Sequence, residues 1–133
     1  MHNHHPHPKF SIITVTYNAA KVLEDTIQSI VTQTYKNLEY IIVDGGSTDE
    51  TLDIIHKYQE HITTVISEPD QGLYDAMNKG LRKARGCYLV FLNAGDAFHE
   101  PDTLQKIADS IEKNDPDIVS VSYTHLTLPT ILR

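Results

Sequence analysis

The sequence predicts an α/β fold in which helices flank a mainly parallel β-sheet. Short apolar segments rich in β-branched residues alternate with segments whose apolar residues recur at helical spacing, the pattern of repeated β-α-β units. Two of the apolar segments, residues 41–43 and 88–92, run directly into polar turns that contain Asp44 and Asp96. Because ligands bind at the carboxyl ends of the strands in open α/β sheets, this pattern also predicts a binding site at that edge.

The first expected elements are a strand, a helix and a second strand. Residues 10–16 are apolar and β-branched, which favours a strand. Asn18 has the side chain of a helix cap, and it precedes a segment with helical periodicity. The expected inward face of this helix consists of Val22, Ile27, Ile30 and Val31. Residues 38–43 form the second strand.

A second helix, a third strand and a third helix are expected next. Ser47 and Glu50 have the spacing of a capping box, so we expect a helix to begin there. Its inward residues are Leu52, Ile55 and Tyr58. Residues 62–66 form the third strand, and residues 73–85 the third helix. The inward residues of the third helix are Leu73, Met77 and Leu81.

The last expected elements are a fourth strand, a fourth helix and the start of a fifth strand. Residues 87–92 are apolar, and Pro101 suits the first turn of the following helix. That helix carries a clean apolar stripe of Leu104, Ile107, Ala108 and Ile111. The fifth strand opens at residues 117–119. Strands that alternate with helices are joined by right-handed crossovers, so the sheet should be mainly parallel.

Composition narrows the function classes. A chain of 133 residues is long enough for one domain with a single core. A net charge of −7 and the absence of a long basic run argue against nucleic acid as the main partner. No apolar run approaches the roughly 18 residues that span a bilayer. The single cysteine excludes an internal disulfide, which fits a reducing, cytoplasmic setting.

Asp44 and Asp96 together suggest a cation site. Either aspartate alone could simply cap a helix, but two acids on one edge suit a cation or the polar edge of a nucleotide. Two like charges about 4 Å apart at an effective dielectric of about 20 repel by roughly 4 kcal/mol. Mg²⁺ reverses this sign, and it typically uses one or two carboxylates together with substrate phosphates. The acids therefore predict a metal-dependent phosphate site.

Other polar residues follow the first and third strands. Thr16, Tyr17 and Asn18 end the first strand at the same edge, where Tyr17 could offer its ring to a base or plug the edge of the sheet. Asp70 and Asp75 follow the third strand. Their carboxylates could bind ribose or sugar hydroxyls, or they could serve the turn and cap the next helix.

The third helix carries two further polar features. Asn78 lies about one turn beyond Asp75 and is a candidate for the same site. A basic side of this helix is either a solvated face or an aid to anion binding, and it consists of Lys79, Arg82, Lys83 and Arg85.

Four segments in order resemble the motifs of family-2 glycosyltransferases. They are residues 8–18, 43–49, 70–80 and 92–96. The resemblance is to the bacterial polysaccharide-building members, and it covers roughly residues 8–119. It implies the nucleotide-sugar-binding half of a GT-A (Rossmann-like) fold. It also implies Mg²⁺ or Mn²⁺, a nucleotide-sugar donor that is commonly a UDP sugar, and a saccharide or lipid-linked acceptor.

The resemblance also implies roles for individual residues. Tyr17 would stack near the base, Asp44 would bind its polar edge, and Asp96 would be the final acid of the Asp-x-Asp metal motif. The first position of that motif is Asn93 or Ala94, depending on the register, so only Asp96 supplies charge. The full expected nucleotide-sugar set is Thr16, Tyr17, Asn18, Asp44, Asp70, Asp75 and Asn78. Some relatives place an arginine just before the last of these, where this chain has Met77.

The resemblance further implies an inverting transferase whose carboxylate base lies on the acceptor half, beyond the end of this chain. The expected organisation is a disordered His-rich leader at 1–9, a nucleotide-sugar-binding part at 10–119 and an atypical tail at 120–133. The tail resembles translated sequencing-adapter sequence, or it is a genuine extra strand because Val119, Val121 and Tyr123 alternate. The full-length protein is expected in the cytoplasm, where it could associate peripherally with the inner face of the membrane.

The sequence also bears on three other functions. A non-catalytic module that binds a nucleotide sugar remains the alternative. A signalling receiver domain requires adjacent acids after the first strand, and residues 16–18 supply none. A dinucleotide dehydrogenase requires Gly-x-Gly-x-x-Gly after that strand, which is also absent from the sequence.

Overall fold

The computed structural model describes residues 8–114, 118–120 and 130–132. In chain order the elements are β1 (Phe10–Thr16), α1 (Ala20–Val31), β2 (Leu38–Asp44), α2 (Thr51–Lys57), the short 3₁₀ helix η1 (Gln59–His61), β3 (Thr64–Ser67), α3 (Leu73–Lys83), β4 (Tyr88–Phe91), α4 (Thr103–Asn114), β5 (Ile118–Ser120) and β6 (Thr130–Leu132). The strands form one sheet in the order β3-β2-β1-β4-β6-β5.

The predicted α/β fold with a mainly parallel sheet is confirmed. Strands β1 to β4 run parallel to one another, and β6 is antiparallel to both β4 and β5. Strand β6 lies within the segment predicted as an atypical tail, in which residues 121–129 are outside the described residues. Among the described residues, no helix has the length and apolar content needed to cross a membrane.

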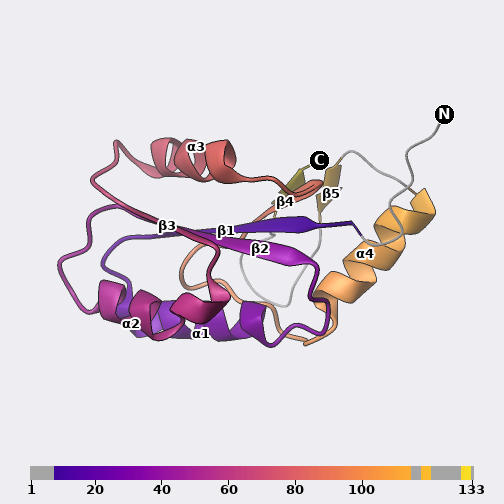
Figure 1. The fold of residues 1–133 in the computed structure, drawn as a ribbon, viewed down its shortest axis with the longest axis horizontal. Helices are drawn as coiled ribbons and strands as arrows, with labels where there is room; N and C mark the ends of the chain where they lie inside the picture. Colours follow the sequence, from indigo (N-terminus) through magenta and orange to yellow (C-terminus); the bar gives the residue numbers. More distant parts are fainter. Residues whose placement is uncertain (1–7, 115–117, 121–129, 133) are drawn as a thin grey trace.

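Helices cover both faces of the sheet (Figure 1). Helices α1, α2 and α4 pack on one face over the larger core cluster, which includes Leu23, Ile27 and Leu104. Helix α3 covers the other face, where Ala76 packs on Ile13 and on other apolar residues of β2 and β4. The carboxyl ends of β1 to β4 therefore lie at one edge of a sheet that is buried on both sides.

Two apolar residues predicted to face inward are instead exposed. Val22 in α1 is 41% exposed and Leu73 at the start of α3 is 49% exposed. In α1 the buried face is rotated toward Leu23 and Thr26, both fully buried. In α3 the helix begins at Leu73 beside a cavity, so its first residue cannot reach the sheet. The apolar stripe of α4 is buried as predicted.

Both predicted helix caps are wrong. Asn18 has a left-handed backbone (φ 44°), and the N-cap residue of α1 is Ala19; the N–H of Ala20 donates to the Asp49 carboxylate (3.3 Å). Helix α2 begins at Thr51 with no capping box, and the carboxylate of Asp49 accepts from the Thr51 N–H instead (2.9 Å). The Asn18 Oδ1 accepts from the Thr48 N–H (2.8 Å), so this side chain fastens the β1–α1 loop to the β2–α2 loop.

Two residues of the predicted leader, Pro8 and Lys9, lie in the described structure and contact the fold. Pro8 is buried, and its carbonyl oxygen accepts from the Tyr35 hydroxyl (2.5 Å). The carbonyl oxygen of Lys9 accepts from the N–H groups of Cys87 and Tyr88 at 2.7 and 3.2 Å. Residues 8 and 9 thus join β1 to the start of β4, while residues 1–7 of the predicted leader are outside the described part of the chain.

Candidate functional site

The carboxyl ends of three neighbouring strands carry the candidate site. Thr16 at the end of β1 is in register with Asp44 at the end of β2. On the other side, the N–H of Ala94, just after β4, donates to the carbonyl oxygen of Val15 (3.0 Å). Asp96 follows two residues later in the turn after β4. Asp44 and Asp96 therefore lie at the same edge of the sheet, after the two strands that flank β1.

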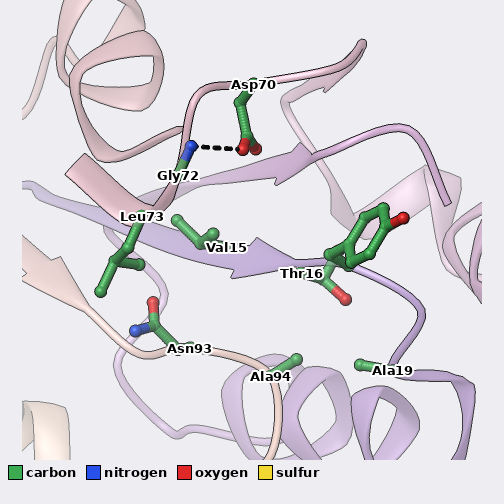
Figure 2. A pocket seen from close by; sticks show the side chains of 9 residues that line it. Val15, Thr16, Ala19, Asp70, Gly72, Leu73, Asn93 and Ala94 are labelled. Atoms are coloured by element: carbon green, nitrogen blue, oxygen red, sulfur yellow. Dashed lines mark hydrogen bonds between the residues drawn. The ribbon is translucent and has the colours of Figure 1, made fainter. Parts of the chain in front are cut away.

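A cavity of about 370 Å³ opens at this edge between the loops after β1, β3 and β4. In Figure 2, Asp70 and Gly72 lie on one side of the end of β1, and Asn93 and Ala94 lie on the other. The lining residues are Val15, Thr16, Tyr17, Ala19, Asp70, Gly72, Leu73, Asn93 and Ala94. Three predicted site residues, Thr16, Tyr17 and Asp70, are thus brought together here.

Two buried polar atoms in the cavity wall have no partner within the described structure. They are the hydroxyl oxygen of Thr16 and the side-chain carbonyl oxygen of Asn93. Thr16 is only 2% exposed. An unsatisfied buried polar atom costs about 1–3 kcal/mol, so such atoms are uncommon unless a ligand or water satisfies them. The described protein therefore leaves two hydrogen-bond acceptors unsatisfied beside the cavity.

Gly45 allows the loops above the cavity to pack closely. A side-chain carbon at this position would lie 2.7 Å from Oδ2 of Asp70 and 3.3 Å from Cδ1 of Tyr17. The other carboxylate oxygen of Asp70 accepts from the Gly72 N–H (3.0 Å), which fixes the start of α3. The Tyr17 side chain is 61% exposed at the cavity wall and offers an aromatic surface.

Asp44 has a structural environment that the sequence did not indicate. It is fully buried, and its Oδ2 accepts from the N–H groups of Gly46 (3.1 Å) and Ser47 (3.0 Å) and from the hydroxyl of Ser67 (2.8 Å). Its Oδ1 accepts from the Ser47 hydroxyl. This carboxylate is an anchor for the loop after β2, and it does not line the cavity. Its contact with a base stays a prediction.

Three other predicted residues lie outside the cavity wall. Asn18 is exposed and bonded to the loop after β2. The Asp75 carboxylate accepts from the Gln71 N–H (2.9 Å) and lies 3.6 Å from the Lys79 ammonium. The Gln71 N–H, followed by Lys79, holds the pKa of Asp75 below its usual value against the opposing effect of desolvation. Asn78 is exposed on α3.

The predicted basic side of α3 divides into two parts. The side chain of Lys79 is only 14% exposed, and its ammonium donates to the carbonyl oxygen of Pro69 (3.0 Å) and lies 3.4 Å from Glu68. It therefore fastens the loop after β3. Arg82, Lys83 and Arg85 are exposed.

Asp96 lies in the turn after β4, is not among the residues that line the cavity, and would offer a hard cation one carboxylate. Asp96 is half-buried, and its N–H donates to the carbonyl oxygen of Asn93 (2.9 Å) in a turn where Gly95 has a φ of 100°. The described residues contain no cluster of three or more His, Cys, Asp or Glu that could hold a metal alone. Mg²⁺ and Mn²⁺ accept one carboxylate when substrate phosphates and water complete the shell.

Sequence reasoning missed Ser67 and undervalued Asn93. Ser67 is paired with Asp44 in the β2–β3 register, so only the strand pairing brings its hydroxyl to that carboxylate. The sequence places Asn93 in the motif after β4. That its side-chain oxygen lacks a partner beside the cavity is visible only in the structure.

The chain matches a family model described as Glycosyl transferase family 2 over residues 11–127. A "PGL/p-HBAD biosynthesis glycosyltransferase" of Mycobacterium bovis (strain BCG / Pasteur 1173P2) is 45% identical over 112 residues. That alignment covers 82% of this chain and 44% of the relative, so the chain spans less than half the length of the curated relative.

Two solved structures of similar fold contain ligands. S. aureus TarS 1-349 in complex with UDP-GlcNAc is 30% identical, with a TM-score of 0.77, and the match covers 83% of this chain and 33% of TarS. The mannosyltransferase PcManGT from Pyrobaculum calidifontis, in complex with GDP-Man and Mn²⁺, is 29% identical with a TM-score of 0.75. That match covers 93% of this chain and 38% of PcManGT. The chain belongs to glycosyltransferase family 2, and its fold is of the GT-A type.

Proposed function

We propose that this family 2 glycosyltransferase chain binds a nucleoside diphosphate sugar, with UDP as the expected nucleotide, in the cavity at the ends of β1 and β4. The observation that carries the proposal is the pair of unpartnered oxygens of Thr16 and Asn93 in the cavity wall. Ribose hydroxyls can donate to both. Tyr17, exposed beside them, supplies a surface on which a base can stack. The UDP-GlcNAc complex of TarS supports this choice of ligand.

Charge supports a requirement for a divalent cation. The described wall of the cavity contains no lysine or arginine, and Asp70 adds a negative charge to it. A diphosphate brought beside these carboxylates is repelled unless a cation lies between them. Asp96 is the residue that would hold Mg²⁺ or Mn²⁺ together with the diphosphate oxygens. When bound, the cation would act as a Lewis acid that neutralises charge on the diphosphate leaving group.

The complete reaction is proposed to be an inverting sugar transfer to a saccharide or lipid-linked acceptor. The residues of this chain would bind and orient the donor, while Asp44 and Asn18 fix the loops after β2 and β1 beside the cavity. We assign no residue here as the base that deprotonates the acceptor hydroxyl, because the base is expected on the acceptor half. A cytoplasmic location with peripheral association at the inner face of the membrane belongs to the same proposal for the full-length protein.

A titration calorimetry experiment and a hydrolysis assay test this function. UDP is expected to bind the chain, and Mn²⁺ is expected to tighten the binding. Failure to bind UDP in the presence of Mn²⁺ would overturn the proposal. Release of sugar from UDP-GlcNAc would indicate a transferase active site, whereas binding without release would favour a non-catalytic nucleotide-sugar-binding module.

Replacing Thr16 with valine should weaken UDP binding without harming the fold. The Thr16 hydroxyl has no partner among the described residues, so its loss should leave the free energy of unfolding unchanged or slightly raised. Loss of one hydrogen bond to the ligand should weaken UDP binding about three- to tenfold. Calorimetry and urea denaturation measure the two effects.

Thr14→Val is the matched control, because the Thr14 hydroxyl is buried and bonded to Tyr40 (2.8 Å) and to the Leu92 carbonyl oxygen (2.7 Å). The Thr14→Val substitution should lower the free energy of unfolding. If Thr16→Val were to destabilise the chain as much as Thr14→Val and leave UDP affinity intact, the hydroxyl would have a structural role instead.

Replacing Tyr17 with alanine should weaken UDP binding by removing the surface on which the base stacks. Base stacking on an aromatic ring contributes about 1–3 kcal/mol, so we expect at least about a fivefold loss of UDP affinity. Binding of pyrophosphate with Mn²⁺ should not change. Tyr74→Ala is the matched control, since Tyr74 is 81% exposed and does not line the cavity. Equal losses for UDP and pyrophosphate would contradict the stacking role.

A further inference from the structure

Helix α1 presents two hydroxyl groups to the turn that contains Asp96. The Thr26 hydroxyl oxygen accepts from the Gly95 N–H (2.9 Å), and the Ser29 hydroxyl oxygen accepts from the Phe98 N–H (3.1 Å). Residues three apart lie on the same face of a helix, so both hydroxyls are directed to one segment. The two N–H groups that they bind lie on either side of Asp96 in the chain.

Both hydroxyls are oriented by their own helix. The Thr26 hydroxyl donates to the carbonyl oxygen of Val22 (3.4 Å), and the Ser29 hydroxyl donates to the carbonyl oxygen of Thr26 (2.8 Å). Because each hydrogen is used inside α1, each oxygen presents lone pairs to the turn. Thr26 is fully buried, so its oxygen is shielded from solvent. The turn is therefore bound to a rigid element at two fixed points.

We infer that Thr26 and Ser29 are positioning residues for Asp96. The N–H of Asp96 itself donates to the Asn93 carbonyl oxygen, so the N–H groups of residues 95, 96 and 98 are all fixed. A carboxylate that shares a cation with a diphosphate must be held at the correct distance from the cavity, and residues that orient metal ligands commonly change metal affinity about 10- to 100-fold. This inference rests on the proposed function.

Gln33 provides a control within the same helix. It is 1% exposed, its side-chain oxygen accepts from the Leu104 N–H (3.1 Å), and its amide donates to the Glu100 carbonyl oxygen (2.7 Å). Gln33 therefore fixes the start of α4 in the way that Thr26 fixes the turn, but at a greater distance along the chain from Asp96. If Thr26 had a structural role alone, replacing Thr26 or Gln33 should affect the Mn²⁺ dependence of UDP binding equally.

The test compares four variants of the full chain: Thr26→Val, Thr26→Ser, Ser29→Ala and Gln33→Leu. For each, the dissociation constant for UDP is measured by calorimetry with and without Mn²⁺, and the melting temperature is recorded. The readout is the ratio of the two constants, the gain due to Mn²⁺. We expect Thr26→Val and Ser29→Ala to reduce this gain at least about fivefold. Thr26→Ser, which keeps the hydroxyl, should retain it.

Gln33→Leu should lower the melting temperature and leave the Mn²⁺ gain unchanged. The inference is overturned if the gain survives in Thr26→Val and Ser29→Ala, or if it falls equally in Gln33→Leu. It is also overturned if the unmodified chain binds UDP with no gain from Mn²⁺. If the unmodified chain binds no UDP at all, the proposed function fails first, which distinguishes the two failures. Ser29→Ala keeps the test decisive if Thr26→Val does not fold.

Discussion

Replacing Asp96 with alanine is expected to remove the gain in UDP affinity that Mn²⁺ provides, while the fold stays intact. Asp96 is half-buried in a turn after β4, where the chain is already fixed by backbone hydrogen bonds. The described cavity wall contains no basic side chain, so the cation is the expected link between protein and diphosphate. We expect the UDP dissociation constant in Mn²⁺ to rise at least about 30-fold, or roughly 2 kcal/mol.

Asp102→Ala is the matched control for this prediction. Asp102 is an aspartate six residues along the chain, and its side chain is 46% exposed beside Lys106. The Asp102→Ala variant should bind UDP and Mn²⁺ as the unmodified chain does. Asp96→Asn, which keeps the shape of the side chain, should lose the Mn²⁺ gain as alanine does. A UDP affinity in Mn²⁺ that is unchanged in Asp96→Ala would show that this carboxylate does not hold the cation.

Replacing Asp44 with alanine is expected to lower the free energy of unfolding by about 3–5 kcal/mol, because several buried donors lose their shared acceptor. The donors are the N–H groups of Gly46 and Ser47 and the hydroxyls of Ser47 and Ser67. Small domains are stable by only about 5–15 kcal/mol, so the variant would be close to unfolding. Urea denaturation measures the loss of stability. UDP affinity should also decrease, because the loop after β2 loses its anchor.

Two variants calibrate the Asp44 result. Ser67→Ala removes one donor and should cost about 1 kcal/mol. Asp53→Ala alters an exposed aspartate on α2 and should change stability by less than about 0.5 kcal/mol. If Asp44→Ala proved as stable as Asp53→Ala and lost affinity for uridine but not for pyrophosphate, the carboxylate would contact the base and would not anchor the loop.

The sequence was sufficient for the parallel part of the sheet and for the edge at which the candidate site lies. Strands β1, β2 and β4 are largely apolar because both faces of a central parallel strand are buried. The apolar stripe of α4 was also readable, since its spacing fits only one face of a helix. Parallel strands place their carboxyl ends together, so the edge that carries Thr16, Asp44 and Asn93 followed from the fold class.

The details that the sequence could not supply depend on contacts between distant residues. Asn18 and Ser47 have the residue types of helix caps, but the Asn18 N–H donates to the Ser47 hydroxyl (2.8 Å) across the two loops. Local spacing cannot reveal such a pair. The anchoring of Asp44 depends in the same way on Ser67, which reaches it through the register of β2 and β3.

The exposure of Leu73 has a related cause. An apolar residue at the start of a helix usually packs inward, yet here the helix begins at the wall of the cavity. Propensity and periodicity describe an isolated element, and they carry no information about where a cavity opens beside it. The same limit applies to Asn93, whose carbonyl oxygen has no partner only because of the surrounding loops.

The most direct test of the account is amide NMR mapping of the bound nucleotide and cation. With UDP and Mg²⁺, amide signals of residues 15–19, 72–73 and 93–96 should shift, and Mn²⁺ should broaden the signals around Asp96 most strongly. The small crevice lined by Lys36, Leu38 and His61 serves as a control and should not respond. Shifts and broadening confined to that crevice, or spread without preference over the surface, would contradict a nucleotide site at the ends of β1 and β4.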